Sequence, residues 1–203
     1  MNLFELKAYC EVNSKAILLL RTATSDYAGA RCLMINGLGA GFSLGAQAIE
    51  KFLKASLLLA DPSIKVRNLS HNLLELLTKS ECHISEIAEL DLRPMAQRFE
   101  RYYQTRYPDN PNQPQGMDTI ELNELDRFVI GIYTCLPCPR NVRFRTGLYA
   151  DITFSLNKNS PYMTHIERWI KERNTSLAAI WPDIEAQYPL VMQELYPQPL
   201  QNV

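Results

Sequence analysis

The chain has 203 residues, of which 46% are hydrophobic, and its formal net charge is -1. This length predicts one domain, or one domain with an appendage, and a charge near zero excludes a globally basic nucleic-acid binder but not a local basic patch. Five cysteines, no basic and apolar leader in MNLFELKAYCEVNSK and no long apolar run favour a reduced, cytoplasmic protein without a membrane span.

Two long helices are predicted in the first third of the chain. Apolar and small residues recur every three or four positions over residues 16–34 and again over 42–57, which is the period of one helical face. The segment NGLGAG at 36–41 separates the two stripes because glycine lowers helix propensity, and DPS at 61–63 ends the second. The stripes comprise Ala16, Leu20, Ala23, Tyr27, Ala30 and Met34, then Phe42, Ala46, Ile49, Leu53 and Leu57.

The middle of the chain predicts three further helices. One begins near Asn68 or Ser70, both good N-cap residue types. Another restarts at Pro94, because the residue before a proline avoids the helical region. The proline-rich segment 106–117 is a linker, and Asp118 then opens a capping box for a helix that extends to about residue 136.

The remainder predicts a short strand pair over residues 141–156, a helix that opens at Ser160-Pro161, and one short helix with a loose end around and beyond Trp181. Helices of this length with short turns predict an all-α fold, an antiparallel helical bundle. We expect residues 1–137 to form the bundle and residues 138–203 to form a C-terminal extension, packed helices and loops of the same domain.

Three segments in the first two thirds carry a resemblance to a known family. They are QAIEKFLKASLL at 47–58, HNLLELL at 71–77 and RYPD at 106–109, in that order. Together they resemble the HEPN superfamily over residues 15–137. The resemblance implies a bundle of four or five helices that is usually a homodimer. Many members are metal-independent ribonucleases of toxin or phage-defence systems, often encoded beside a minimal nucleotidyltransferase, and others have lost catalysis and act as binding or scaffold subunits.

Arg67 and His71 are the candidate catalytic pair. The family signature is an arginine, four to six intervening residues and a histidine, whereas three residues intervene here. Histidine titrates near the pH that general-base chemistry on a 2′-hydroxyl needs, and arginine can clamp the charged phosphate. Both side chains share one helical face only if the helix includes Arg67. The alternatives are a solvated arginine beside a histidine that satisfies a backbone or carboxylate partner, and a phosphate contact without hydrolysis.

Two further groups are predicted to contact a nucleotide or RNA. Glu50, Lys51 and Lys54 of the second long helix resemble polar residues that can line the family's groove near the histidine, although a surface ion pair with solvated lysines is the ordinary alternative. Of these we take Glu50 and Lys54 as candidate contacts, together with Asn68 beside the candidate catalytic pair. Arg140, Arg143 and Arg145 flank Phe144, and basic residues around an aromatic ring suit a nucleic-acid backbone and base. The alternative for these arginines is a solvated loop that pairs with acidic helix faces.

Metal and cofactor chemistry has weak support in the sequence. Cys135 and Cys138 form a single CxxC that could take Cys82 and His83 as further zinc ligands, but free thiols are the favoured interpretation, so we predict no metal and no cofactor. For partners we predict a homodimer, packed through small residues of the first two long helices, with RNA or a nucleotide and a nucleotidyltransferase as further candidates. The small residues are Ala23, Ala30, Gly45 and Ala46.

The function predicted is that of a HEPN-like, nucleotide- or RNA-associated subunit of a prokaryotic defence or toxin–antitoxin type system. One alternative is a metal-independent endoribonuclease that uses Arg67 and His71. The other is a structural protein-interaction module whose apolar surface docks a partner.

Overall fold

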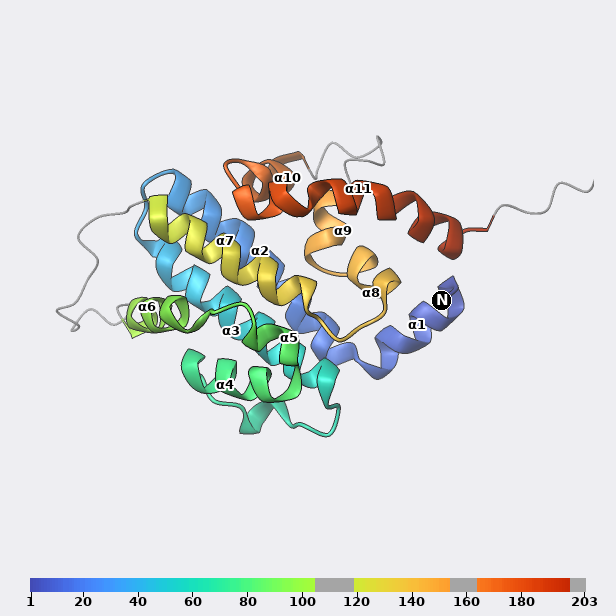
Figure 1. Cartoon of the computed structure of the whole chain (residues 1–203), viewed down its shortest axis with the longest axis horizontal. Helices are drawn as coiled ribbons and strands as arrows, with labels where there is room; N and C mark the ends of the chain where they lie inside the picture. The colour runs from blue at the N-terminus through green and yellow to red at the C-terminus, as the bar shows by residue number, and fades with distance from the viewer. Residues whose placement is uncertain (105–118, 154–163, 198–203) are drawn as a thin grey trace, which may run out of the picture.

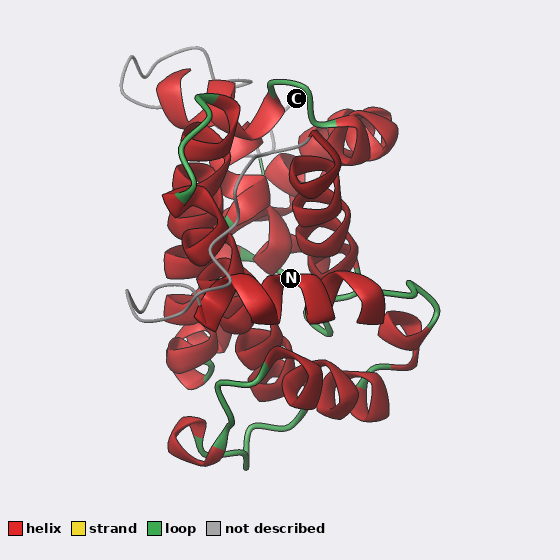
Figure 2. Cartoon of the chain, turned by 90° about the vertical axis from the view of Figure 1, so that its left-hand side faces the viewer, coloured by secondary structure: helices red, strands yellow, loops and turns green. Residues whose placement is uncertain are grey.

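The computed structural model describes residues 1–104, 119–153 and 164–197, and all regular structure in these ranges is helical (Figures 1 and 2). This confirms the all-α prediction. The predicted linker at 106–117, the capping box at Asp118 and the helix start at Ser160-Pro161 lie outside the described residues. The helices are α1 (Leu3–Val12), α2 (Ser14–Ile35), α3 (Ala40–Ala60), the 3₁₀ turn η1 (Val66–Asn68), α4 (Leu73–His83), α5 (Ser85–Ala88), α6 (Arg93–Gln104), α7 (Thr119–Thr134), α8 (Arg140–Arg145), α9 (Leu148–Thr153), α10 (Thr164–Lys171) and α11 (Thr175–Leu195).

Helices α2 and α3 form a tightly packed hairpin. The connection uses Gly37 at a φ of +77°, a left-handed conformation that glycine adopts without strain. At Gly41 the two helices approach each other closely. A Cβ on this residue would lie 2.6 Å from Cγ of Met34 and 2.9 Å from the carbonyl oxygen of Ala30. The predicted break at 36–41 is therefore both a turn and a packing site.

The small residues of this hairpin are buried within the chain itself. Ala23, Ala30 and Ala46 have no exposed surface, and a Cβ on Gly45 would lie 3.2 Å from the Phe99 ring. Their role is to let α2, α3 and α6 approach one another. The expectation that they form a dimer interface is wrong, because no part of these side chains is left for a second copy.

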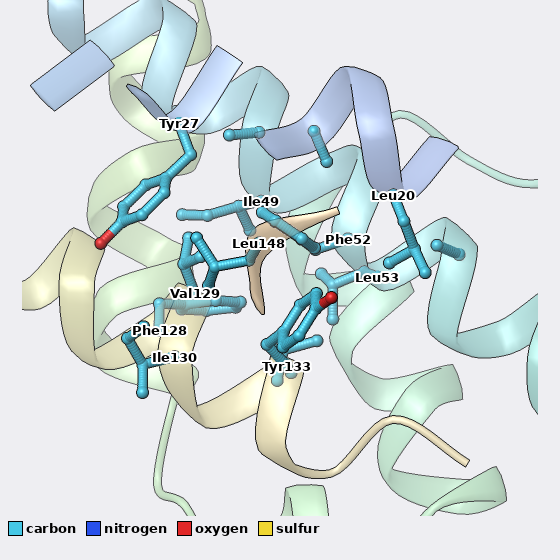
Figure 3. Close-up of a cluster of buried hydrophobic side chains, with 14 of the residues drawn as sticks. Leu20, Tyr27, Ile49, Phe52, Leu53, Phe128, Val129, Ile130, Tyr133 and Leu148 are labelled. Carbon is cyan, nitrogen blue, oxygen red and sulfur yellow. The ribbon is translucent and has the colours of Figure 1, made fainter. Parts of the chain in front are cut away.

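Helix α3 lies at the centre of the molecule and packs against α2, α4, α6 and α7. Figure 3 shows Ile49, Phe52 and Leu53 of α3 facing residues of α7, among them Val129 and Tyr133. Full burial of side chains this large contributes roughly 1.5–3 kcal/mol each. These contacts make α3 the rigid element from which polar side chains can be positioned.

Two predictions for the C-terminal part are wrong. Helices α8 and α9 occupy residues for which a strand pair was expected. Helix α11 is a long helix that contains Pro182 and Pro189, not a short one. An interior proline opposes a helix by about 3 kcal/mol, but apolar residues at near-heptad spacing bury one face of α11 and offset this loss. These residues are Leu177, Ile184, Val191 and Leu195.

A buried polar network fastens the C-terminal helices to α2 and α7. Arg31 is fully buried, forms an ion pair with Asp126, and donates from Nε to the carbonyl oxygen of Trp169 at 2.7 Å. The Tyr27 hydroxyl donates to Asp126 at 2.7 Å and accepts from Asn174 at 2.8 Å. Burial raises the pKa of Asp126, an effect that the Arg31 guanidinium opposes. These bonds connect α2, α7, α10 and the start of α11.

No helix in the described part of the chain is long and apolar enough to cross a lipid bilayer.

Candidate functional site

The segment between α3 and α4 is an irregular loop that ends in a defined helix cap. Asn72 accepts a hydrogen bond from the Glu75 amide at 2.9 Å, and Ser70 accepts one from the Asn72 amide at 3.1 Å. Helix α4 therefore begins at Leu73, later than the predicted start at Asn68 or Ser70, because the Asn72 side chain satisfies the first free amides.

Arg67 and His71 consequently do not share a helical face. Arg67 lies on the separate turn η1, with its side chain exposed. In the described ranges it forms no hydrogen bond or ion pair, with His71 or with any other group. The two side chains would share one helical face only if the helix included Arg67, and it does not. Their joint catalytic role stays a prediction.

His71 instead contacts Glu50 of α3, so the arrangement observed is the alternative of an exposed arginine beside a histidine with a carboxylate partner. Its Nδ1 atom lies 2.9 Å from Oε1 of Glu50, and the same oxygen accepts a hydrogen bond from Nζ of Lys54 at 2.8 Å. The His71 side chain is 74% exposed, whereas the Glu50 side chain is 10% exposed. When Nδ1 carries the proton, Nε2 of the neutral ring is an unprotonated acceptor. Because a carboxylate only accepts, this contact favours the ring form that carries a proton on Nδ1.

The pair Glu50–Lys54 differs from the solvated surface bridge considered as the ordinary alternative. Both residues are buried, with 7% and 5% of their surface exposed. Moving two charges out of water costs several kcal/mol per ion, which their attraction offsets only with good geometry. The buried ion pair touches an exposed histidine, and this contact makes Glu50, Lys54 and His71 a candidate functional centre.

Glu100 of α6 is a further site residue, which the sequence analysis missed. Its Oε2 atom accepts a hydrogen bond from the Leu73 amide at 2.6 Å, so a carboxylate occupies the N-terminus of α4. This position is where a helix would otherwise bind a phosphate. No local pattern marks Glu100, because only the packing of α6 on α4 brings it there. A phosphate bound near the start of α4 would therefore have to contact His71, or Arg67 of η1 and Lys65 beside it.

Asn68 belongs to a different feature. It lines a shallow hollow of about 430 Å³ between the η1 loop and the far end of α4, together with Lys65, Lys79 and His83. Nδ1 of His83 lies 2.9 Å from the carbonyl oxygen of Lys79. His71 does not line this hollow, so Asn68 and His71 face separate parts of the surface.

The three arginines of α8 are dispersed. Arg140 forms an ion pair with Glu194 of α11, and Arg143 donates to the carbonyl oxygen of Thr134 at 2.8 Å. Arg145 is exposed. Phe144 is buried and packs against Tyr149 and Tyr188, so it offers no free face to a base. Helix α8 lies beside α1 and α11, whereas α4 lies below α3 in the same view (Figure 1).

The cysteines are free thiols. Burial raises the pKa of Cys138 to about 12, which opposes formation of the thiolate that zinc needs. In the residues that the structure describes, no group of three or more histidine, cysteine and acidic side chains is placed to hold a metal ion. Cys82, His83, Cys135 and Cys138 therefore do not come together as a zinc site.

Comparisons with known proteins add no family assignment. No family model matches the chain, and the curated proteins and the solved structures give no significant match.

Proposed function

We propose that the chain is a HEPN-like subunit that associates with RNA or a nucleotide in a prokaryotic defence or toxin–antitoxin type system. The observation that carries the proposal is the contact between the buried Glu50 carboxylate and the exposed His71 ring. Its interaction surface is the α3–α4 corner, defined as Glu50, Lys54, Arg67 and His71. The cytoplasmic location, the homodimer and a nucleotidyltransferase partner belong to the same proposal.

The α3–α4 corner suits a phosphate-bearing ligand. Lys65 and Arg67 are exposed on and beside η1, and the oriented imidazole of His71 lies a few residues along the chain. Lysine and arginine contact phosphates through charge-assisted hydrogen bonds, and a His71 ring protonated at both nitrogens could do the same. Glu50 and Glu100 limit the affinity for such a ligand, because their negative charges repel anions from the N-terminus of α4. Binding is therefore expected to be moderate and strongly dependent on salt.

Binding of a fluorescein-labelled single-stranded RNA, followed by anisotropy against salt concentration, tests the proposal. We expect log Kd to vary linearly with log salt, and Arg67→Ala to reduce the slope by about 1. His71→Ala should also weaken binding. The matched controls are His83→Ala, an exposed histidine at the last position of α4, and Arg168→Ala, an exposed arginine on α10. Equal losses in the control variants, or no binding by the wild type, would contradict the proposal.

A second candidate function is metal-independent RNA cleavage. The Glu50–His71 hydrogen bond favours it, because a carboxylate on one ring nitrogen orients the imidazole and stabilises its protonated form during general-base catalysis. Arg67 would supply the positive charge for the phosphate.

RNA incubated in EDTA, with wild type compared with His71→Ala and Glu50→Gln, separates this candidate from simple binding. We expect products that end in a 2′,3′-cyclic phosphate, lost in His71→Ala. Cleavage that persists in His71→Ala excludes His71 as the base, and binding without cleavage supports the associated-subunit function alone.

A further inference from the structure

A second hollow lies on another part of the molecule, between α1, α2 and the end of α8. Its volume is about 640 Å³, within the range of small-molecule sites. Leu3, Phe4 and Leu6 of α1 form its apolar wall. Phe4 is 81% exposed, which is unusual for so large an apolar side chain and leaves an aromatic face open beside the hollow.

Three cations from three different helices line the same hollow. They are Lys7 of α1, Arg21 of α2 and Arg145 at the end of α8. In the described part of the chain none of them forms an ion pair, although many other lysines and arginines do. Arg145 donates to a neutral partner, the hydroxyl of Tyr196, at 3.1 Å. The remaining lining includes no acidic residue.

Acidic side chains of neighbouring helices do not line this hollow. Glu5 of α1 accepts the Asn2 amide in the capping box that begins the helix. Asp151 of α9 is close enough to Arg21 for the guanidinium to act on its pKa, but it neither lines the hollow nor forms an ion pair with Arg21. Within the lining of the hollow the three cations therefore have no acidic partner.

We propose that this hollow, defined by Leu3, Phe4, Leu6, Lys7, Arg21 and Arg145, binds a small amphipathic organic anion. The ligand has an aromatic or aliphatic body, which packs on the α1 wall, and one carboxylate, sulfonate or phosphate group, which accepts hydrogen bonds from the cations. An apolar wall with a few polar groups beside it is a usual feature of small-molecule sites, and this hollow presents both on an open surface. Arginine at two of the three positions favours a planar or tetrahedral oxyanion.

The site is independent of the α3–α4 corner. None of its lining residues belongs to that corner, and its apolar wall differs from the polar surface that a nucleic-acid backbone needs. RNA binding at His71 and anion binding here can therefore succeed or fail separately.

Titration with 8-anilinonaphthalene-1-sulfonate, an aromatic anion whose fluorescence rises in apolar surroundings, tests the proposal on the intact chain. The uncharged N-phenyl-1-naphthylamine is the matched probe. We expect one bound sulfonate per chain, and an affinity that falls about tenfold or more in the double variant Arg21→Gln, Arg145→Gln. The uncharged probe should bind the two proteins equally. Arg168→Gln is the control variant, with unchanged affinity for both probes.

Two outcomes of this titration would overturn the proposal. One is sulfonate binding that is equally strong in the double variant, and the other is an uncharged probe that binds as tightly as the sulfonate. Far-UV circular dichroism and the melting temperature check that the variants are folded, because the sulfonate also binds partly unfolded chains.

The thiol of Cys10 gives a second readout that needs no variant. Cys10 lines the hollow, whereas Cys82 is exposed on α4. Alkylation of each thiol by iodoacetamide can be followed by peptide mass spectrometry. The bound sulfonate should slow alkylation of Cys10 several-fold and leave Cys82 unchanged. Equal rates with and without the probe would place it elsewhere and refute the site.

Discussion

Nδ1 of His71 lies 2.9 Å from Oε1 of Glu50, so a mostly exposed ring is joined to a carboxylate that belongs to the protein interior. The same oxygen holds Lys54. One acid therefore performs two tasks: it compensates a buried cation and it orients a surface histidine. The two tasks can be separated by substitution.

Glu50→Gln should lower the free energy of unfolding by about 3–5 kcal/mol, because it leaves Lys54 buried without a counter-charge. Chemical denaturation with urea measures the change. Adding Lys54→Met should restore most of the stability, because the unpaired charge is removed. The control is Glu75→Gln, which breaks the exposed pair Glu75–Lys79 at the same i,i+4 spacing and should have a much smaller effect. Comparable losses in both single variants would show that burial of the pair has no energetic consequence.

Asp126→Ala should be among the most destabilising substitutions in the chain. It leaves the guanidinium of the fully buried Arg31 without its carboxylate, a loss of about 3–5 kcal/mol. Tyr27→Phe removes only a hydroxyl from the same network and should cost about 1–2 kcal/mol. Thermal or urea unfolding distinguishes the two magnitudes. An Asp126→Ala protein as stable as Tyr27→Phe would mean that Arg31 finds water or another partner.

Asp151 predicts a stability that depends on pH. Burial raises its pKa from 3.8 to about 6, with Arg21 partly opposing the rise. The folded protein therefore binds the proton more tightly than the unfolded chain does, and ionisation of Asp151 opposes folding increasingly from about pH 4 to pH 6. Above pH 6 this penalty is complete.

Asp151→Asn removes that penalty. At pH 7.5 it should raise stability by about 1 kcal/mol after allowance for partial exposure, a melting temperature roughly 2–4 °C higher. At pH 4 and below, where the wild-type carboxyl is protonated, the difference should vanish. Asp183→Asn, an exposed acid on α11, is the control and should show no such pH dependence. A benefit that is the same at both pH values would exclude ionisation of Asp151 as its cause.

The helices were largely predictable from the sequence, since the stripes at 16–34 and 42–57 and the breaks at 36–41 and 61–63 depend on local periodicity and turn residues. The errors arose where tertiary packing decides. Residues 141–156 show a weak alternation, but a core formed by α7 and α11 selects the short helices α8 and α9. Prolines in the tail argue locally against a helix, and buried leucine, isoleucine and valine side chains overrule them.

The candidate site was predictable in part. Glu50, Lys54 and His71 were all singled out, but their mutual contact joins residues 21 positions apart on different elements, which no spacing rule gives. The sequence left open whether Arg67 shares a helix with His71, and the cap at Asn72 decides against it because α4 begins after both residues. Glu100 and the hollow beside α1 depend entirely on how distant helices pack.

The small residues of the α2–α3 hairpin give a prediction about assembly. Ala30→Leu should destabilise the fold of the single chain by about 1–3 kcal/mol through overpacking, because Ala30 is completely buried between the two helices. The loss should not depend on protein concentration. Light scattering of wild type and variant at several concentrations checks this. If the variant kept its stability and only lost the ability to form a dimer, these small residues would belong to a dimer interface after all.

The two tryptophans test whether the C-terminal helices are part of the same cooperative unit. Trp169 lies in α10 and Trp181 lies in α11, so tryptophan fluorescence reports on these two helices alone. Circular dichroism at 222 nm reports on all the helices of the chain. The network through Arg31, Asp126 and Asn174 predicts coincident unfolding curves from both probes.

Asn174→Ala should shift both unfolding curves together, by about 2 kcal/mol. It removes the cap of the Leu177 amide at the start of α11 and the bond to the Tyr27 hydroxyl. Fluorescence that changes at lower denaturant concentration than circular dichroism, in the wild type or only in the variant, would show that residues 164–197 unfold as a separate unit. In that case the polar network would anchor an appendage and not complete the core.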